Sequence, residues 1–209
     1  MPDAHSLLLF ILAGLALNVT PGPDMLYIVA RSSTEGRRAG IVSALGVAVG
    51  TLVHIAALAL GLAAVLRSVP LAYDTVRLAG AGYLIYLGIR AFLHSPMSNA
   101  HVTIERASLW AIFRQGVVTN VLNPKVALFF LAFLPQFVDP SRGAPAVQMA
   151  VLGLIFDLNG TLVNVSVALG AHSVASLFLG EQSRNARIMG RATGVLFIGL
   201  GARVALMRK

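Results

Sequence analysis

The sequence predicts an all-α polytopic membrane protein with six transmembrane helices, arranged as a 3+3 inverted-topology repeat in which helices 1 and 4 are broken at proline. Three observations carry this prediction: the apolar composition, six long apolar segments, and an ordered similarity between the two halves of the chain. Of the 209 residues, 57% are hydrophobic and 11% are charged. A soluble domain is about half apolar and about a quarter charged, so this chain has too few polar residues to cover a soluble surface.

Six segments are long and apolar enough, or nearly so, to cross a hydrocarbon core of about 30 Å, which needs about 20 helical residues. They are residues 6–30, 40–66, 71–93, 111–138, 146–176 and 192–207. The first segment has neither the basic leading residues nor the small-residue cleavage site of a signal peptide. We therefore expect it to be retained as a membrane span.

The basic residues are unevenly distributed among the connections, and the net charge is +8. They are dense in the first, third and fifth connections, whereas the second and fourth hold only Arg67 and Arg142. Short connections rich in Lys and Arg stay in the cytoplasm. We therefore expect the odd connections to be cytoplasmic and both termini to lie outside the cytoplasm. This role accounts for much of the charge, so we expect no nucleic-acid partner.

The two halves of the chain resemble each other segment by segment, in the same order. The matching motifs are Asn18-Val-Thr-Pro21 with Asn120-Val-Leu-Asn-Pro124, Gly50-Thr-Leu-Val53 with Gly160-Thr-Leu-Val163, and Arg77-x-x-Gly80 before Gly88-x-Arg90 with Arg191-x-x-Gly194 before Gly201-x-Arg203. A repeat with an odd number of spans crosses the membrane in the opposite sense in its second copy. Inverted repeats are typical of transporters, whose substrate site lies near the membrane midplane between the repeats.

We therefore expect one membrane transporter domain over residues 1–209. Repeat 1 is expected at about 6–93, a cytoplasmic connection at about 94–110, and repeat 2 at about 111–207.

The first and fourth segments each contain a proline-centred break, Thr20-Pro-Gly-Pro-Asp24 and Asn120-Val-Leu-Asn-Pro-Lys125. Proline removes a backbone donor and clashes with the preceding turn. Unwound backbone at membrane depth persists only where protein or a water-filled cavity satisfies its polar groups. The half-helices that start near Pro23 and Pro124 would present free N–H groups, which suit a carboxylate. A plain proline kink is the alternative, but the paired breaks, each followed by a charge, favour a binding site.

Lys125 lies near the middle of the fourth segment, about 20 Å from either end, so its side chain cannot reach the interface. A charge at that depth costs several kcal/mol unless it is paired. We expect its partner to be Asp157, which shares one helical face with Thr161, Asn164 and His172. A purely structural Lys–Asp pair is the alternative.

Two further groups have open interpretations. Asp24 is expected either to cap the half-helix after the first break or to carry a coupling proton, and His54 is interpreted as a satisfied interior residue. The Gly46-x-x-x-Gly50 spacing indicates close helix packing, either within the bundle or across a homodimer.

The predicted substrate-binding residues come from both breaks and the fifth segment. They are Asn18, Pro21, Gly22, Pro23, Asp24, Asn120, Asn123, Pro124, Lys125, Asp157 and Asn164. The chain has no Cys, which excludes thiolate metal sites and thiol redox chemistry. It also has no nucleotide-binding loop, zincin motif or dinucleotide fingerprint. We assign no catalytic residue, no metal ligand and no cofactor, so an ion gradient must supply the energy.

Four motifs together resemble those of the LysE/RhtB family of bacterial amino-acid exporters. They are Leu17-Asn-Val-Thr-Pro-Gly-Pro-Asp24, Gly36-Arg-Arg-Ala-Gly40, Leu78-Ala-Gly-Ala-Gly-Tyr-Leu-Ile-Tyr-Leu-Gly-Ile-Arg90, and Asn120-Val-Leu-Asn-Pro-Lys125 followed by Phe133-Leu-Pro-Gln-Phe137. The resemblance implies export of amino acids or close derivatives across the bacterial inner membrane, driven by the proton gradient. A zwitterionic substrate fits the charges, with its carboxylate at Lys125 and its ammonium at Asp157 or Asp24.

Two other functions are alternatives to amino-acid export. An exporter of another small solute, such as a divalent cation, would need several carboxylates or His residues to converge, and the buried Lys125 opposes a cation. A membrane enzyme that uses Lys125 or His172 as nucleophile or base would need a partner constellation that the sequence lacks.

Overall fold

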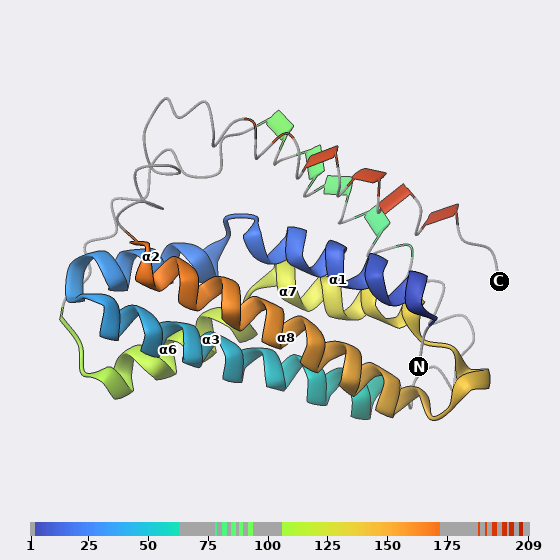
Figure 1. Cartoon of the computed structure of the whole chain (residues 1–209), viewed down its shortest axis with the longest axis horizontal. Helices are drawn as coiled ribbons and strands as arrows, with labels where there is room; N and C mark the ends of the chain where they lie inside the picture. The colour runs from blue at the N-terminus through green and yellow to red at the C-terminus, as the bar shows by residue number, and fades with distance from the viewer. Residues whose placement is uncertain are drawn as a thin grey trace.

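The computed structural model describes residues 3–62 and 106–171, together with short helical pieces between 78 and 93 and between 188 and 206. The predicted third and sixth segments lie mostly outside the described residues, as do residues 94–105 and His172. The described part of the chain is helical (Figure 1). Its elements are α1 (Ala4–Val19), α2 (Pro23–Glu35), α3 (Arg37–Ala57) with the π-helical turn η1 (Leu58–Leu62), α6 (Leu109–Val121), α7 (Pro124–Leu128) with η2 (Phe129–Phe133) and η3 (Leu134–Phe137), η4 (Pro140–Arg142) and α8 (Pro145–Leu169).

Local sequence explains where these helices begin and end. The Asp3 carboxylate accepts a hydrogen bond from the Ser6 N–H at 2.9 Å and caps α1, and the Ser108 hydroxyl caps α6 in the same way. Gly36 alone separates α2 from α3, with a φ of 90°. That conformation costs a residue with a Cβ far more than it costs glycine, so the reversal between these two helices depends on Gly36.

Both predicted breaks are present. The axis bends by 50° between α1 and α2 and by 44° between α6 and the α7–η3 segment. Two further helices, Arg37–Gly61 and α8, are long and apolar enough to cross a membrane on their own, which gives up to four spans if each bent pair counts as one. The chain is therefore an all-helical, multi-pass membrane protein.

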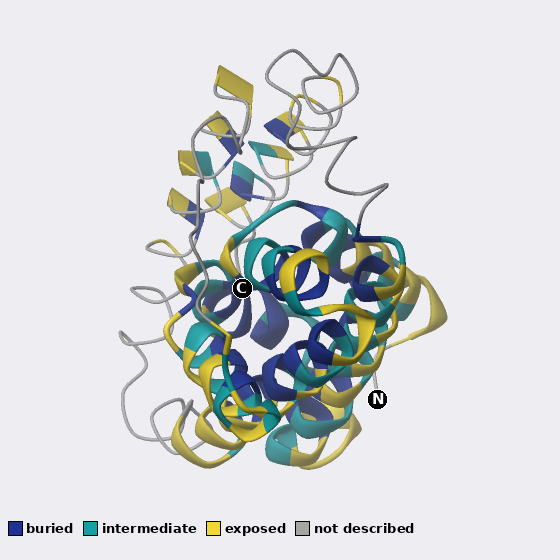
Figure 2. Cartoon of the chain, turned by 90° about the vertical axis from the view of Figure 1, so that its left-hand side faces the viewer, coloured by how far each residue is buried: buried dark blue, intermediate teal, exposed yellow. Residues whose placement is uncertain are grey.

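The helix surfaces that face the centre of the bundle carry the buried residues, and the outward surfaces carry the exposed ones (Figure 2). One core cluster contains the aromatic residues Phe10, Phe129, Phe130 and Phe156, and α3 packs against α2, α6 and α8. Many of the exposed residues are large and apolar, such as Leu12, which is 52% exposed. An apolar outer face with a packed interior is what a lipid environment requires.

The helices α3 and α6 approach each other through glycine. A Cβ at Gly46 would overlap the carbonyl oxygen of Phe113, and a Cβ at Gly116 would lie 2.7 Å from the carbonyl oxygen of Ser43. The Gly46 spacing therefore serves packing within the bundle, the first of its two interpretations.

Replacing Gly46 with Ala should lower the Tm of the detergent-purified protein by about 3–10 °C, because overpacking costs about 1–3 kcal/mol. Gly61→Ala is the matched control, since a Cβ there meets no atom of the described residues within 4 Å. Equal Tm values for the two variants in a thermal unfolding assay would contradict this account of the contact.

Arg31 comes directly after the first predicted segment, residues 6–30, which would place it in the first connection, but the structure places it in a helix. It lies inside α2, is 5% exposed and forms an ion pair with Glu35. Its guanidinium also donates to the Gln115 side-chain oxygen at 2.7 Å. The exposed basic residues at this end of the bundle are instead Arg37, Arg38, Arg106 and Arg114.

Candidate functional site

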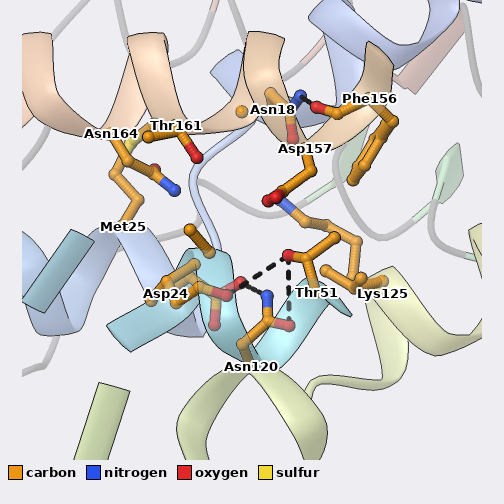
Figure 3. A pocket seen from close by; sticks show the side chains of 14 residues that line it. Asn18, Asp24, Met25, Thr51, Asn120, Lys125, Phe156, Asp157, Thr161 and Asn164 are labelled. Atoms are coloured by element: carbon orange, nitrogen blue, oxygen red, sulfur yellow. Dashed lines mark hydrogen bonds between the residues drawn. The ribbon is translucent and has the colours of Figure 1, made fainter. Parts of the chain in front are cut away.

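The two breaks lie side by side near the middle of the bundle (Figure 1). With α3 and α8 they enclose a cavity that is lined by six of the predicted side chains: Asn18, Asp24, Asn120, Lys125, Asp157 and Asn164 (Figure 3). The other five predicted residues, Pro21, Gly22, Pro23, Asn123 and Pro124, form the breaks themselves. The cavity volume that is accessible to water is about 20 Å³, which is enough for about one water molecule. This conformation is therefore closed to a substrate as large as an amino acid.

At the first break, Lys125 supplies a donor that proline has removed. In an unbroken helix the Leu17 carbonyl would accept from the residue four positions later, but that residue is Pro21, which has no N–H. The Lys125 ammonium donates to the Leu17 carbonyl at 3.0 Å and to the Thr20 carbonyl at 2.9 Å. Its positive charge also lies at the negative end of the α1 dipole.

At the second break, His54 has the equivalent role. Pro124 removes the donor that the Asn120 carbonyl would have in an unbroken helix, and His54 Nε2 lies 3.1 Å from that carbonyl oxygen. Because a carbonyl only accepts, Nε2 must carry the hydrogen. The interpretation of His54 as a satisfied interior residue is confirmed, and its specific role at the second break was not predicted.

Asp24 connects α2 to the second break. Its Oδ2 accepts hydrogen bonds from the side-chain amides of Asn120 and Asn123, each at 2.9 Å. All three side chains are buried. The N-cap of α2 is Gly22, and no side chain caps it, so the expectation that Asp24 caps this half-helix is wrong. Asp24 Oδ1 is buried and has no hydrogen-bond partner among the described residues.

The charge after each break therefore reaches across to the other break. Asp24 follows the first break and holds the side chains of the second, whereas Lys125 follows the second break and holds the backbone of the first.

The repeated Gly-Thr motifs lie beside the asparagines of the breaks. A Cβ at Gly50 would lie 2.7 Å from the Asn120 Cβ, and a Cβ at Gly160 would lie 3.1 Å from the Asn18 amide nitrogen. Thr51, next to Gly50, donates to the Asn120 side-chain oxygen at 3.3 Å. Each motif thus adjoins a break from the other half of the chain. Thr51 was missed as a site residue, although its place in the repeated motif was the signal that could have found it.

The expected ion pair between Lys125 and Asp157 is wrong for this conformation. Both residues line the cavity, but the ammonium is hydrogen-bonded to main-chain oxygens, and no ion pair within 4 Å joins the two. The physical reason is the first break, where the Leu17 carbonyl has lost its helical donor to Pro21 and accepts from the Lys125 ammonium as well as from the Thr20 N–H. Asp157, Thr161 and Asn164 do share one face of α8 and line the cavity opposite the breaks (Figure 3).

His54 should stabilise the second break measurably. Replacing it with Leu leaves the buried Asn120 carbonyl with the Asn123 N–H but without the His54 donor, at a cost of about 0.5–1.5 kcal/mol, or a fall in Tm of roughly 1–5 °C. Because a Gln side chain can donate to the same carbonyl, His54→Gln should retain most of the stability. A His54→Leu variant as stable as His54→Gln in thermal unfolding would show that the bond contributes little.

Comparison with known proteins places this arrangement in a family. The family model of the LysE type translocator matches residues 15–208. An uncharacterized membrane protein of Pseudomonas aeruginosa is 31% identical over 205 residues, which cover 94% of this chain and 93% of the relative. A leucine efflux protein of Salmonella choleraesuis is 24% identical over 95% of this chain and 94% of the relative. No solved structure matches the chain at a significant level.

The family match covers both breaks and all of the cavity-lining residues, the first of which is Asn18. Translocators move solutes across membranes and are not enzymes. This multi-pass membrane protein belongs to the LysE type translocator family.

Proposed function

We propose that this protein exports amino acids or close derivatives from the cytoplasm in exchange for protons. The reciprocal placement of Asp24 and Lys125 between two broken helices is the observation that carries this proposal. It brings a carboxylate and an ammonium into one cavity, as a zwitterionic substrate requires. The similarity to leucine efflux proteins supports the same substrate class.

The orientation follows from the charged ends of the bundle. The exposed Arg37, Arg38, Arg106 and Arg114 lie at the end where α2 finishes and α6 begins. Because the positive-inside rule assigns such an end to the cytoplasm, we propose that it faces the cytoplasm of the bacterial inner membrane and that both termini lie outside. A single domain of six spans in a 3+3 inverted repeat, with repeats at about 6–93 and 111–207, fits the paired breaks and paired Gly-Thr motifs.

The polar groups of the cavity can bind the two ends of an amino acid. An ammonium has three donors, and two of those on Lys125 are used by the backbone, which leaves the third for a substrate carboxylate. The substrate ammonium would then face Asp24 Oδ1 or Asp157. Met25, Val47 and Phe156 supply an apolar wall, which suits an uncharged side chain.

Asp157 is the group to which we assign the coupling proton. Asp24 holds the second break through two amide donors, whereas Asp157 lines the cavity from α8 and holds neither break among the described residues. Protonation of Asp157 would weaken its attraction for the substrate ammonium, so proton entry from outside would favour substrate release.

Asp157→Asn should still exchange amino acids but should lose its response to a proton gradient. The assay uses proteoliposomes loaded with radiolabelled leucine, with and without an acidic exterior and with an uncoupler as control. We expect the gradient to accelerate efflux by about tenfold in the wild type, about 1.4 kcal/mol of driving force, and by less than twofold in Asp157→Asn. Gradient-driven efflux that persists in the variant would overturn this assignment, and export of a loaded divalent cation instead of amino acids would overturn the proposed function.

A further inference from the structure

The C-terminal end of α1 is shaped around a cation. The carbonyl oxygens of Leu17 and Thr20 converge on one point, where the Lys125 ammonium lies 3.0 Å and 2.9 Å from them. Helix C-termini attract positive charge. Pro21 cannot donate to the Leu17 oxygen, which accepts from the Thr20 N–H at 3.1 Å as well as from the ammonium.

Gly22 provides the space for this cation. A Cβ at position 22 would lie 3.1 Å from Lys125 Nζ and 3.4 Å from its Cε, closer than a side chain normally approaches. The backbone on both sides of Pro21 therefore contributes to the same site, with two oxygens on one side and a glycine notch on the other.

Main-chain oxygens, not a carboxylate, hold the ammonium in place. Among the described residues, the other charged and titratable groups around the cavity are Asp24, Asp157 and His54. Asp24 and His54 are hydrogen-bonded to Asn120, and Asp157 lines the cavity without an ion pair to Lys125. A site made of carbonyl oxygens recognises charge and donor geometry, so the tether that joins the ammonium to α7 is not part of the recognition.

We propose that the end of α1 is a binding site for a small primary ammonium ion, and that Lys125 is its built-in occupant. Because the occupant is covalently attached, the protein needs no free cation at this position. For transport we therefore expect efflux to be unchanged when sodium is replaced by choline. That expectation rests on the proposed function, whereas the existence of the cation site does not depend on it.

The test is to remove the occupant and supply a free one. Purified Lys125→Ala is unfolded thermally in methylammonium chloride and, at equal ionic strength, in choline chloride, whose head group is too large for the notch. We expect methylammonium at about ten times its Kd to raise the Tm by about 3–5 °C. Choline should not raise the Tm, and the wild type should not respond to either salt. Equal responses to the two salts, or a wild-type response equal to that of the variant, would overturn the proposal.

A second variant covers the case in which Lys125→Ala does not fold. The chain has no cysteine, so Lys125→Cys offers a unique thiol. Its thiolate displaces methanesulfinate from a methanethiosulfonate reagent and forms a mixed disulfide. The aminoethyl reagent restores an ammonium and should raise the Tm towards the wild-type value, whereas the ethyl reagent should not. Equal Tm values for the two adducts would overturn the proposal. If wild-type vesicles show no amino-acid efflux but these Tm differences appear, the proposed function fails and the cation site stands.

Discussion

Asp24→Ala is expected to reduce amino-acid efflux by at least about 100-fold and to destabilise the protein by about 3–5 kcal/mol, the usual cost of removing one partner from a buried charged network. The variant leaves the buried amides of Asn120 and Asn123 without their shared acceptor, at about 1–3 kcal/mol each. It also removes a negative charge near the Lys125 ammonium. The Tm should fall by about 10 °C, and efflux from loaded proteoliposomes should approach the protein-free leak.

Two controls separate the possible causes. Asp3→Ala removes a carboxylate that only caps α1 at the protein surface, so it should cost about 1 kcal/mol and leave efflux intact. Asp24→Asn keeps an acceptor oxygen but removes the charge, so it should fold better than Asp24→Ala and still fail to export. Efflux by Asp24→Ala within twofold of the wild type would contradict a role for Asp24 in the transport site.

Lys125→Met should have the second large effect, again with loss of efflux by about 100-fold or more. The apolar side chain fills the space but leaves the Leu17 and Thr20 carbonyls without the donor they share and removes the group to which we assign the substrate carboxylate. Arginine should not substitute, because its guanidinium is larger and planar and the Gly22 backbone lies close to the Lys125 ammonium.

The double variant Asp24→Asn with Lys125→Met makes this prediction sharper. It removes one charge of each sign, so the cavity keeps its net charge. We expect the loss of Tm in the double variant to be smaller than the sum of the two single losses, as for residues that interact. Additive losses in thermal unfolding would show that Asp24 and Lys125 act independently, and retained efflux in Lys125→Met would remove Lys125 from the site.

The positions of the breaks could be predicted from sequence because proline acts locally. Pro21 and Pro124 each lack an N–H, whatever surrounds them, and the bends occur where they stand. The grouping of Asp157 with Thr161 and Asn164 was also predictable, because helical periodicity alone places them on one face.

The partners of the charged residues could not be predicted in the same way. Depth along a helix suggested Asp157 for Lys125, but which group a side chain meets depends on how the helices are rotated against one another. Each proline removes the helical donor of the carbonyl four residues before it. Identifying those two carbonyls would have indicated main-chain acceptors for Lys125 and a donor such as His54 for Asn120. Arg31 was misplaced because its partner Gln115 comes from a distant part of the sequence.

The small size of the closed cavity has a consequence for proton leakage across the membrane. With room for about one water molecule, it cannot hold the continuous file of waters along which protons hop. In this conformation the cavity between the breaks therefore gives protons no water path through the part of the chain that the structure describes. An exporter that stays in it between transport cycles would not dissipate, through this cavity, the membrane potential on which other pumps and the synthesis of ATP depend.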